Sequence, residues 1–236
     1  CPKLLRRQEL VPLMRALGDR AGAFADVDHH QSRPGGSVGS GEDQQPVGRK
    51  SAREPDEVVH VYDADWRPAP RVALYEGYKA NRAVDPDGLP EQFDLLREIL
   101  EAFGMTQAES PGWEAEDAIG VLCVRASKSD RIEIVTGDRD LIQLVRDPLV
   151  RVLFTRRGVS ELDVLDEAAV LDKYGVPAER YVDYAILRGD PSDGLPGIYG
   201  VGEKTARVLV QAYPTLEALV EDARSEQRRG APLRRS

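Results

Sequence analysis

Hydrophobic and polar positions follow two different rules along the chain, and the change between them predicts two structural regions. From Asp56 to about Asp166, short apolar runs alternate with segments whose apolar residues recur every three or four positions. Such runs are typical of buried strands, and the longer spacing is typical of amphipathic helices. Strands that alternate with helices predict an α/β fold with a mainly parallel sheet flanked by helices. From Glu167 onward the pattern predicts an all-helical region.

The individual elements follow from the same periodicities. In the first region we expect strands at residues 57–62, 131–136 and 150–155, helices at 90–103 and 113–126, and a short helix through Leu141 and Leu144. In the second region a turn rich in Gly and Pro at residues 194–202 leads into a helix at 204–212. Glycine and proline interrupt regular structure, so this turn divides the helical region.

Residues 1–55 differ from both regions. Residues 9–17 have the spacing of an amphipathic helix, but the following residues, rich in Gly, Ser, Gln and Glu, lack any periodicity. We therefore expect poor order in this segment, and we expect the polar, basic tail at 224–236 to fray. Residue 1 is Cys rather than Met, which is typical of a sequence that begins inside a longer reading frame.

Composition narrows the class of protein. No apolar run approaches the length of a membrane span, and no signal peptide is evident, so we expect a cytoplasmic protein without a membrane partner. Two cysteines cannot form a disulfide framework, and Cys123 lies in an apolar run, where a small buried side chain is expected. The net charge of −9 taken alone argues against a nucleic-acid partner. A metal site, however, concentrates acidic residues in one place and leaves basic patches elsewhere.

Carboxylates gather at three kinds of position. Asp63 and Asp138 each follow an apolar strand, and the ends of parallel strands share the edge of the sheet where ligands bind. Glu114, Glu116 and Asp117 open the second helix. Asp140 follows Asp138 at a spacing of two, and Asp190 and Asp193 precede a Pro and a Gly, respectively. Acids in a first helical turn also complement the helix dipole, and Asp before Gly or Pro is ordinary turn chemistry, so each group alone has a structural explanation.

Taken together, the carboxylates predict a metal site. Oxygen ligands suit Mg²⁺ or Mn²⁺, and the lack of a Cys/His set argues against zinc. The adjacent pair His29 and His30 lies in the segment without periodicity, so we interpret it as solvated. Two ions roughly 3.5–4 Å apart can orient a water nucleophile and stabilise the leaving oxygen of a phosphodiester, and holding them requires several acids.

Two further segments have the residues that contact nucleic acid. In residues 66–82, Arg71, Lys79 and Arg82 alternate with tyrosines such as Tyr78; Arg and Lys bind phosphates and aromatic rings stack on bases, although a solvated helix face has the same pattern. The turn at 194–206 is more specific. Its exposed backbone amides and the helix that follows predict a phosphate clamp of the helix-hairpin-helix type. The residues expected in the clamp are Gly197, Gly200, Gly202, Lys204 and Thr205.

Four motifs, at residues 78–82, 112–120, 136–144 and 189–206, resemble those of the 5′-nuclease family in order and spacing. That family includes bacterial 5′-3′ exonucleases, the N-terminal domain of DNA polymerase I and flap endonucleases. The resemblance implies a PIN-like nuclease domain at 56–166, a helix-hairpin-helix subdomain at 167–223, and hydrolysis of 5′ ends and flaps of DNA by a monomer. It implies that the eight carboxylates hold two Mg²⁺ or Mn²⁺ ions, that Lys79 and Arg82 meet the scissile phosphate, and that K⁺ binds carbonyls of the hairpin.

The sequence departs from the family pattern at two places. Glu116 occupies a position that is usually Asp. Members of the family begin with an apolar strand that ends in a metal-ligand Asp. Residues 23–26 resemble this strand only weakly, which favours a truncated or frame-shifted start. Two alternatives therefore stay open beside an active nuclease. One is a catalytically weakened DNA-binding protein of the same fold; the other is a haloacid-dehalogenase-type phosphatase, whose Asp-x-Asp motif Asp63 and Asp65 resemble.

Overall fold

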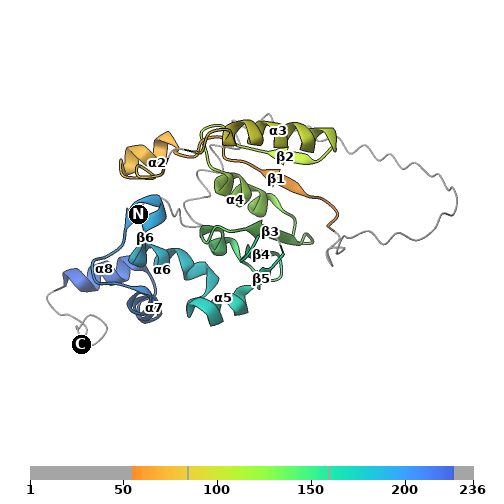
Figure 1. Ribbon diagram of the computed structural model, residues 1–236. Helices are drawn as coiled ribbons and strands as arrows, with labels where there is room; N and C mark the ends of the chain where they lie inside the picture. The colour runs from red at the N-terminus through yellow and green to blue at the C-terminus, as the bar shows by residue number, and fades with distance from the viewer. Residues whose placement is uncertain (1–54, 84, 159, 226–236) are drawn as a thin grey trace.

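The computed structural model describes residues 55–83, 85–158 and 160–225. The helix expected at residues 9–17, the imitation of a ligand strand at 23–26 and most of the basic tail lie outside the described residues. Within the described part, an α/β region is followed by a mainly helical region, as the sequence predicted (Figure 1). No helix within the described residues has the length and apolar content needed to cross a membrane.

The first part of the α/β region is a small parallel sheet with two helices. Strand β1 (Val59–Val61) pairs in parallel with β2 (Thr106–Ala108). Helix α2 (Ala69–Leu74) follows β1, and α3 (Leu89–Ala102) runs alongside β2 at the top of Figure 1. The apolar stripe predicted for α3 is present, but Phe93 and Ile99 are 48% and 44% exposed among the described residues. This part of the fold therefore buries little apolar surface of its own.

The second part is a three-stranded sheet on which the core is built. Strand β3 (Ile132–Thr136) pairs in parallel with β4 (Val150–Thr155), and β5 (Leu162–Leu165) adds an antiparallel edge. Helix α4 (Ala115–Arg125) lies between the two sheets in Figure 1. The short 3₁₀ helix η1 (Asp140–Leu144) follows β3, as predicted.

The helical region packs against this second sheet. It contains α5 (Glu167–Tyr174), η2 (Ala178–Arg180), α6 (Tyr181–Arg188), α7 (Glu203–Ala212) and α8 (Leu216–Arg224). The sequence prediction of an all-helical region missed one short feature: β6 (Gly189–Asp190) pairs with β7 (Leu195–Pro196) around the 3₁₀ turn η3 (Pro191–Asp193). Strands of two residues have too few positions to show any periodicity.

One hydrophobic core joins the second sheet to the helices. Ile142, Val150, Val170 and Tyr181 are fully buried in it. Cys123 is also buried there, as predicted, and its burial raises the pKa of the thiol from 9.0 to about 11. Among the described residues, the core cluster and the side chains packed on it lie between residues 119 and 219.

Candidate metal centre

The first group of acidic residues lies at the start of α4, around Glu114. This side chain is 1% exposed, and the Tyr78 hydroxyl donates a hydrogen bond of 2.5 Å to it. The ammonium group of Lys79 and the guanidinium of Arg71 also form ion pairs with the Glu114 carboxylate. A buried carboxylate needs such partners because its desolvation is costly. Glu114 is therefore the centre of a buried network that joins α4 to residues 71–79.

Three other carboxylates belong to the same group, which we call the α4 cluster. Glu114 and Asp117 form a capping box, in which each side chain accepts a hydrogen bond from the other residue's backbone N–H. Asp63 accepts a hydrogen bond of 2.7 Å from the backbone N–H of Ala115. Arg71 donates to Asp117 over 2.7 Å and approaches Glu116 at 3.4 Å. The positive end of the α4 dipole favours this gathering of negative charge.

A second group, the η3 cluster, forms where β3 and β6 end. One carboxylate oxygen from each of Asp140, Asp190 and Asp193 lies within 4.8 Å of the other two. Asp140 and Asp193 are buried, and Asp190 is half-buried. Asp138 adjoins the group because its carboxylate accepts a hydrogen bond of 2.8 Å from the backbone N–H of Asp140. The acid that follows β3 therefore supports this group.

A basic segment, residues 78–82, connects the two clusters. The side chain of Lys79 contacts Glu114, while its backbone N–H donates to the backbone oxygen of Asp193 over 2.9 Å. Arg82 donates to the Asp193 carboxylate, also over 2.9 Å. Lys79 has a positive φ of 52°, an uncommon backbone conformation for a residue other than glycine. The two bases predicted to meet the scissile phosphate thus lie at the junction of the clusters.

The turn at Gly194 explains how the segment comes so close. Gly194 has φ +71°, and a Cβ atom there would lie 2.6 Å from the backbone oxygen of Gly77. No side chain fits at that separation, so glycine allows the two backbones to meet. The functional clusters are therefore held together by backbone contact as well as by ion pairs.

The sequence predicted a single shared site, and the structure arranges the same eight acids as two neighbouring clusters. Of the described residues, the carboxylates that approach one another within 4.8 Å as a group of three are those of the η3 cluster. Asp63 is held at the start of α4 and Asp138 beside Asp140. The donor sets of both clusters consist of carboxylate oxygens, which suits Mg²⁺ or Mn²⁺. The η3 cluster therefore fits the predicted metal, whereas Arg71 and Lys79 pair with carboxylates of the α4 cluster, and the assignment of individual ligands stays a prediction.

Arg71 and Tyr78 were predicted to contact DNA, but in the structure both side chains bind the buried carboxylate of Glu114. They are 5% and 0% exposed, respectively, and both bind Glu114. Their contacts depend on α4, which is distant in sequence, so a local pattern of basic and aromatic residues could not reveal them. Direct contact with DNA stays a prediction that their burial disfavours.

The glycines of the predicted clamp have separate structural reasons. A Cβ atom on Gly197 would lie 2.1 Å from the backbone oxygen of Arg188, so this glycine is needed for close packing of the turn. Gly200 has φ +78°, and nothing lies near its Cβ position. Gly202 is the N-cap residue of α7, and the exposed Lys204 follows in its first turn. Thr205, in the same turn, is half-buried.

Sequence comparison identifies relatives of the whole described region. Residues 48–175 match the profile of the 5′-3′ exonuclease N-terminal resolvase-like domain, and residues 176–236 match that of the 5′-3′ exonuclease C-terminal SAM fold. A 5′-3′ exonuclease of Streptomyces coelicolor is 44% identical over 186 residues, which cover 72% of this chain and 61% of that protein. DNA polymerase I of Mycobacterium bovis is 46% identical over 169 residues, or 71% of this chain and 18% of the polymerase. The chain therefore spans about three fifths of the length of the exonuclease relatives.

Solved structures support the fold. A bacteriophage T5 flap endonuclease in complex with DNA and metal ions has a TM-score of 0.57 at 16% identity, and covers 72% of this chain and 64% of the phage protein. A zinc-bound T5 5′-exonuclease has a TM-score of 0.56 at 17% identity, over 72% of this chain and 65% of that chain. The α/β domain followed by a helical subdomain is thus confirmed, while the predicted boundaries at 55/56, 166/167 and 223/224 stay predictions. On the strength of both sequence profiles and the close relatives, the chain belongs to the 5′-3′ exonuclease family.

Proposed function

We propose that this chain is a divalent-metal-dependent nuclease that hydrolyses phosphodiester bonds of DNA at 5′ ends and 5′ flaps. The observation that carries the proposal is the junction of two carboxylate clusters at Lys79 and Arg82. The ion pairs also hold the β1–β2 part in place, but that structural role does not require the three carboxylates of the η3 cluster to lie within 4.8 Å of one another. The names of the relatives, 5′-3′ exonuclease and DNA polymerase I, agree with this chemistry.

The clusters have distinct proposed roles. Asp140, Asp190 and Asp193, supported by Asp138, would hold one divalent ion. The four acids of the α4 cluster, Asp63, Glu114, Glu116 and Asp117, would hold or hydrate a second ion. When bound, the two ions supply a polarised water nucleophile and stabilise charge on the leaving oxygen. Mg²⁺ and Mn²⁺ are the ions proposed, because all eight ligand candidates are carboxylates.

Lys79 and Arg82 would act on the substrate. Both carry a positive charge beside carboxylates at the junction, and Arg82 keeps 43% of its side chain exposed. The exposed Arg82 would contact a phosphodiester bound at the junction directly, whereas Lys79 is 4% exposed and would act through its charge; both charges would offset negative charge as it grows on the phosphate oxygens. Their proposed role is therefore electrostatic stabilisation of the reacting phosphate.

The hairpin after β7 would bind the duplex part of the DNA at a place separate from the metal centre. Exposed Gly200, Gly202 and Lys204 precede or open α7, where backbone N–H groups and the helix dipole favour phosphate oxygens. A K⁺ ion on carbonyl oxygens of this turn is part of the same proposal. These contacts read no sequence, so we expect binding that depends on DNA shape and salt concentration.

The test is cleavage of a labelled 5′-flap DNA by the full chain. We expect products with Mg²⁺ or Mn²⁺, none with EDTA, and binding without cleavage in Ca²⁺. Asp193→Asn, which removes a buried carboxylate of the η3 cluster, should lower the rate at least about 100-fold. Asp163→Asn is the matched control, because Asp163 is a half-buried acid that pairs with Lys173 outside both clusters.

Two outcomes would replace this proposal. Binding of the flap DNA without any cleavage in Mg²⁺ or Mn²⁺ would identify a weakened, DNA-binding member of the family. Hydrolysis of a small phosphomonoester that is lost in Asp63→Asn would instead identify phosphatase chemistry, and would leave the hairpin without a purpose.

A further inference from the structure

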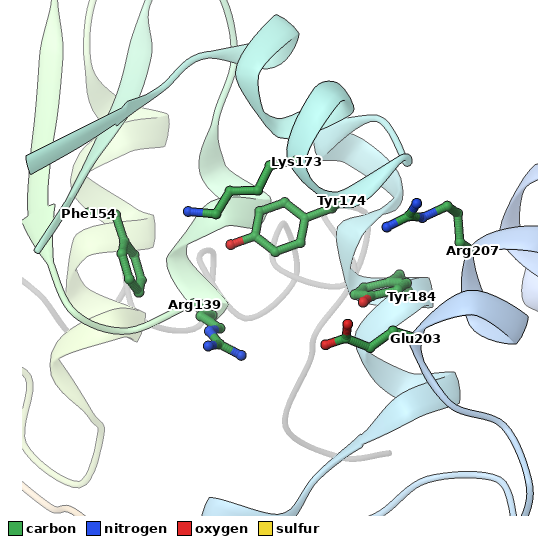
Figure 2. A pocket seen from close by; sticks show the side chains of 7 residues that line it. All are labelled: Arg139, Phe154, Lys173, Tyr174, Tyr184, Glu203 and Arg207. Carbon is green, nitrogen blue, oxygen red and sulfur yellow. The ribbon is translucent and has the colours of Figure 1, made fainter. Parts of the chain in front are cut away.

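A cavity of about 220 Å³ lies between the second sheet and the helical region, and one of its lining residues, Arg139, adjoins Asp140 of the η3 cluster in sequence. Its lining comes from β4, α5, α6, α7 and the N-cap residue of η1, and contains none of the site residues predicted from the sequence (Figure 2): Arg139, Phe154, Lys173, Tyr174, Tyr184, Glu203 and Arg207. The cavity is therefore a feature that only the folded chain creates, and neither acid cluster accounts for it.

The charged residues that line the cavity differ in whether they have an ion-pair partner. Lys173 donates a hydrogen bond of 2.8 Å to Asp163, and Glu203 is approached by Arg188 at 3.4 Å, so both have partners outside the cavity. Arg139 and Arg207, in contrast, form no ion pair with a carboxylate in the part of the chain that the structure describes. Two guanidinium groups consequently face a space in which an anion would find donors.

Arg207 gives the sharpest indication of a ligand. Its Nε atom is buried and has no hydrogen-bond partner among the described residues. Its side-chain stem lies against Gly175, where a Cβ atom would come within 2.4 Å of the Arg207 Cδ atom, so the stem is held in place. A buried donor without a partner is costly, and a phosphate oxygen would satisfy it with a charge-assisted hydrogen bond.

Aromatic rings form the rest of the wall. Figure 2 shows the Tyr174 ring between Phe154 and Arg139 on one side and Tyr184 and Arg207 on the other. The Tyr174 and Tyr184 ring centroids are 6.4 Å apart, and Tyr174 packs edge-on against Tyr181, with centroids 5.1 Å apart. Lys173 lies over the Phe154 and Tyr174 rings, and Arg188 lies over the Tyr184 ring, so a base would stack on the ring surface that these cations leave open. Stacking of this kind tolerates any base.

The size and position of the cavity restrict the kinds of ligand that it can bind. Its volume is below the roughly 300–1,000 Å³ typical of sites that enclose a whole drug-sized molecule, so it has room for a phosphate and one adjoining ring, and none for a duplex. Arg139 lies between Asp138 and Asp140 of the proposed metal centre, and Arg207 lies on α7, which follows the hairpin. The lining of the cavity thus contains a residue that adjoins the proposed metal centre in sequence and residues of the helix that follows the proposed duplex clamp.

We propose that this cavity binds one unpaired nucleotide unit, with its phosphate on Arg139 and Arg207 and its base against the tyrosine rings. The unit is either part of a DNA strand or a free mononucleotide, because both present the same chemistry. Only the assignment to a DNA strand rests on the proposed nuclease function. Binding of a mononucleotide can be measured without any cleavage.

The test measures binding of dTMP, thymidine and inorganic phosphate to the full chain by calorimetry in EDTA, so that a metal centre contributes nothing. We expect dTMP to bind more tightly than phosphate, and thymidine more weakly than both. Arg207→Gln should weaken dTMP binding roughly tenfold, because a charged donor is lost. Tyr174→Leu should weaken dTMP binding at least about fivefold while leaving phosphate binding unchanged.

The control is Arg151→Gln, which makes the same change of charge at an exposed residue of β4 that does not line the cavity. It should leave dTMP binding unchanged, and thermal midpoints should show that all variants fold. Equal dTMP binding by wild type and Arg207→Gln, or equal affinity for dTMP and phosphate, would overturn the proposal.

A second arm distinguishes the two sources of nucleotide. Binding of a labelled 5′-flap DNA is measured in Ca²⁺, with and without dTMP as competitor. If the cavity holds a nucleotide of the strand, Arg207→Gln weakens DNA binding and dTMP competes; if it holds a free mononucleotide, DNA binding is unchanged while dTMP binding is lost. Absence of cleavage in Mg²⁺ would contradict the nuclease proposal and leave the dTMP result intact.

Discussion

The two sheets of this protein are attached to the rest of the molecule in different ways. The β3–β4–β5 sheet shares a hydrophobic core with the helical region, and residues such as Ile142 and Val150 are fully buried in it. The β1–β2 part is joined through polar contacts: Arg71, Tyr78 and Lys79 to Glu114, and Arg82 to Asp193. Its helix α3 has no fully buried residue among those described.

The acid clusters therefore have a structural role in addition to their proposed chemistry. Apolar packing is tolerant of pH and salt, whereas a buried ion-pair network depends on every member keeping its charge. In the β1–β2 part, the groups proposed for catalysis are also the groups that hold the region in place. Four measurements test this difference between the two regions.

The largest effect is expected from Glu114→Gln. This change removes a carboxylate that is 1% exposed and leaves the buried charges of Arg71 and Lys79 without their main partner. Breaking a buried pair in this way costs about 3–5 kcal/mol, measured as the free energy of unfolding in urea. Hydrogen exchange should rise first in β1 and α2.

Glu116→Gln provides the control for this change. Glu116 is 18% exposed and approaches Arg71 at 3.4 Å, so its neutralisation should cost under about 1 kcal/mol. Equal and small losses in the two variants would show that the polar network does not hold the β1–β2 part.

A core substitution should have a slightly smaller effect on the other region. Ile142, a residue of η1, is fully buried, and Ile142→Ala leaves a cavity that costs about 2–5 kcal/mol in urea unfolding. The loss should be independent of salt, because no charge is involved. A loss that changed steeply between 0.05 M and 0.5 M NaCl would contradict the assignment of this region to apolar packing.

The third effect depends on pH. Burial raises the pKa of the Cys123 thiol to about 11, from 9.0, and the nearby Arg146 opposes this shift. Because the unfolded chain loses the thiol proton first, this contribution to stability is complete below pH 9 and is lost as the pH rises from 9 to 11. The loss is on the order of 2 kcal/mol, measured as the difference between wild type and Cys123→Ala across that range. If the difference stayed constant from pH 8 to 11, the thiol would be solvated.

The smallest effect is expected for Ile99→Ala in α3. The same substitution as at Ile142 now acts on a side chain that is 44% exposed, and alanine favours the helix. We expect a change within about 1 kcal/mol, and the pair of isoleucine variants measures the contrast between the two regions directly. A loss as large as that of Ile142→Ala would mean that α3 is packed in the full chain.

The strands and helices with long apolar patterns could be predicted from the sequence, and the short polar ones could not. Residues 131–136 and 150–155 are rich in β-branched and apolar side chains, so β3 and β4 were expected and found. Strand β2, with the sequence Thr-Gln-Ala, has no hydrophobic alternation to detect. Its pairing with β1 is a consequence of tertiary structure, which overrides weak local preference.

The candidate site divides in the same way. The acids could be proposed because strand ends and helix starts are predictable positions, and their type suits a metal. Their division into two clusters could not, because it depends on how residues 78–82 lie against Glu114 and Asp193, which are far away in sequence. The cavity at Arg207 was missed for the same reason, since its lining residues come from elements that only folding brings together.

The capping box at the start of α4 has a consequence for how relatives of this protein should be compared. Glu114 and Asp117 satisfy backbone N–H groups of their own helix, so selection for a folded chain alone would preserve both acids. A descendant that had lost its activity would still keep them. Asp138 and Asp190 are more accessible to solvent than these two. They too accept hydrogen bonds from backbone N–H groups, those of Asp140 and Ser192, so the presence of these four acids in a relative is no evidence that its chemistry is retained.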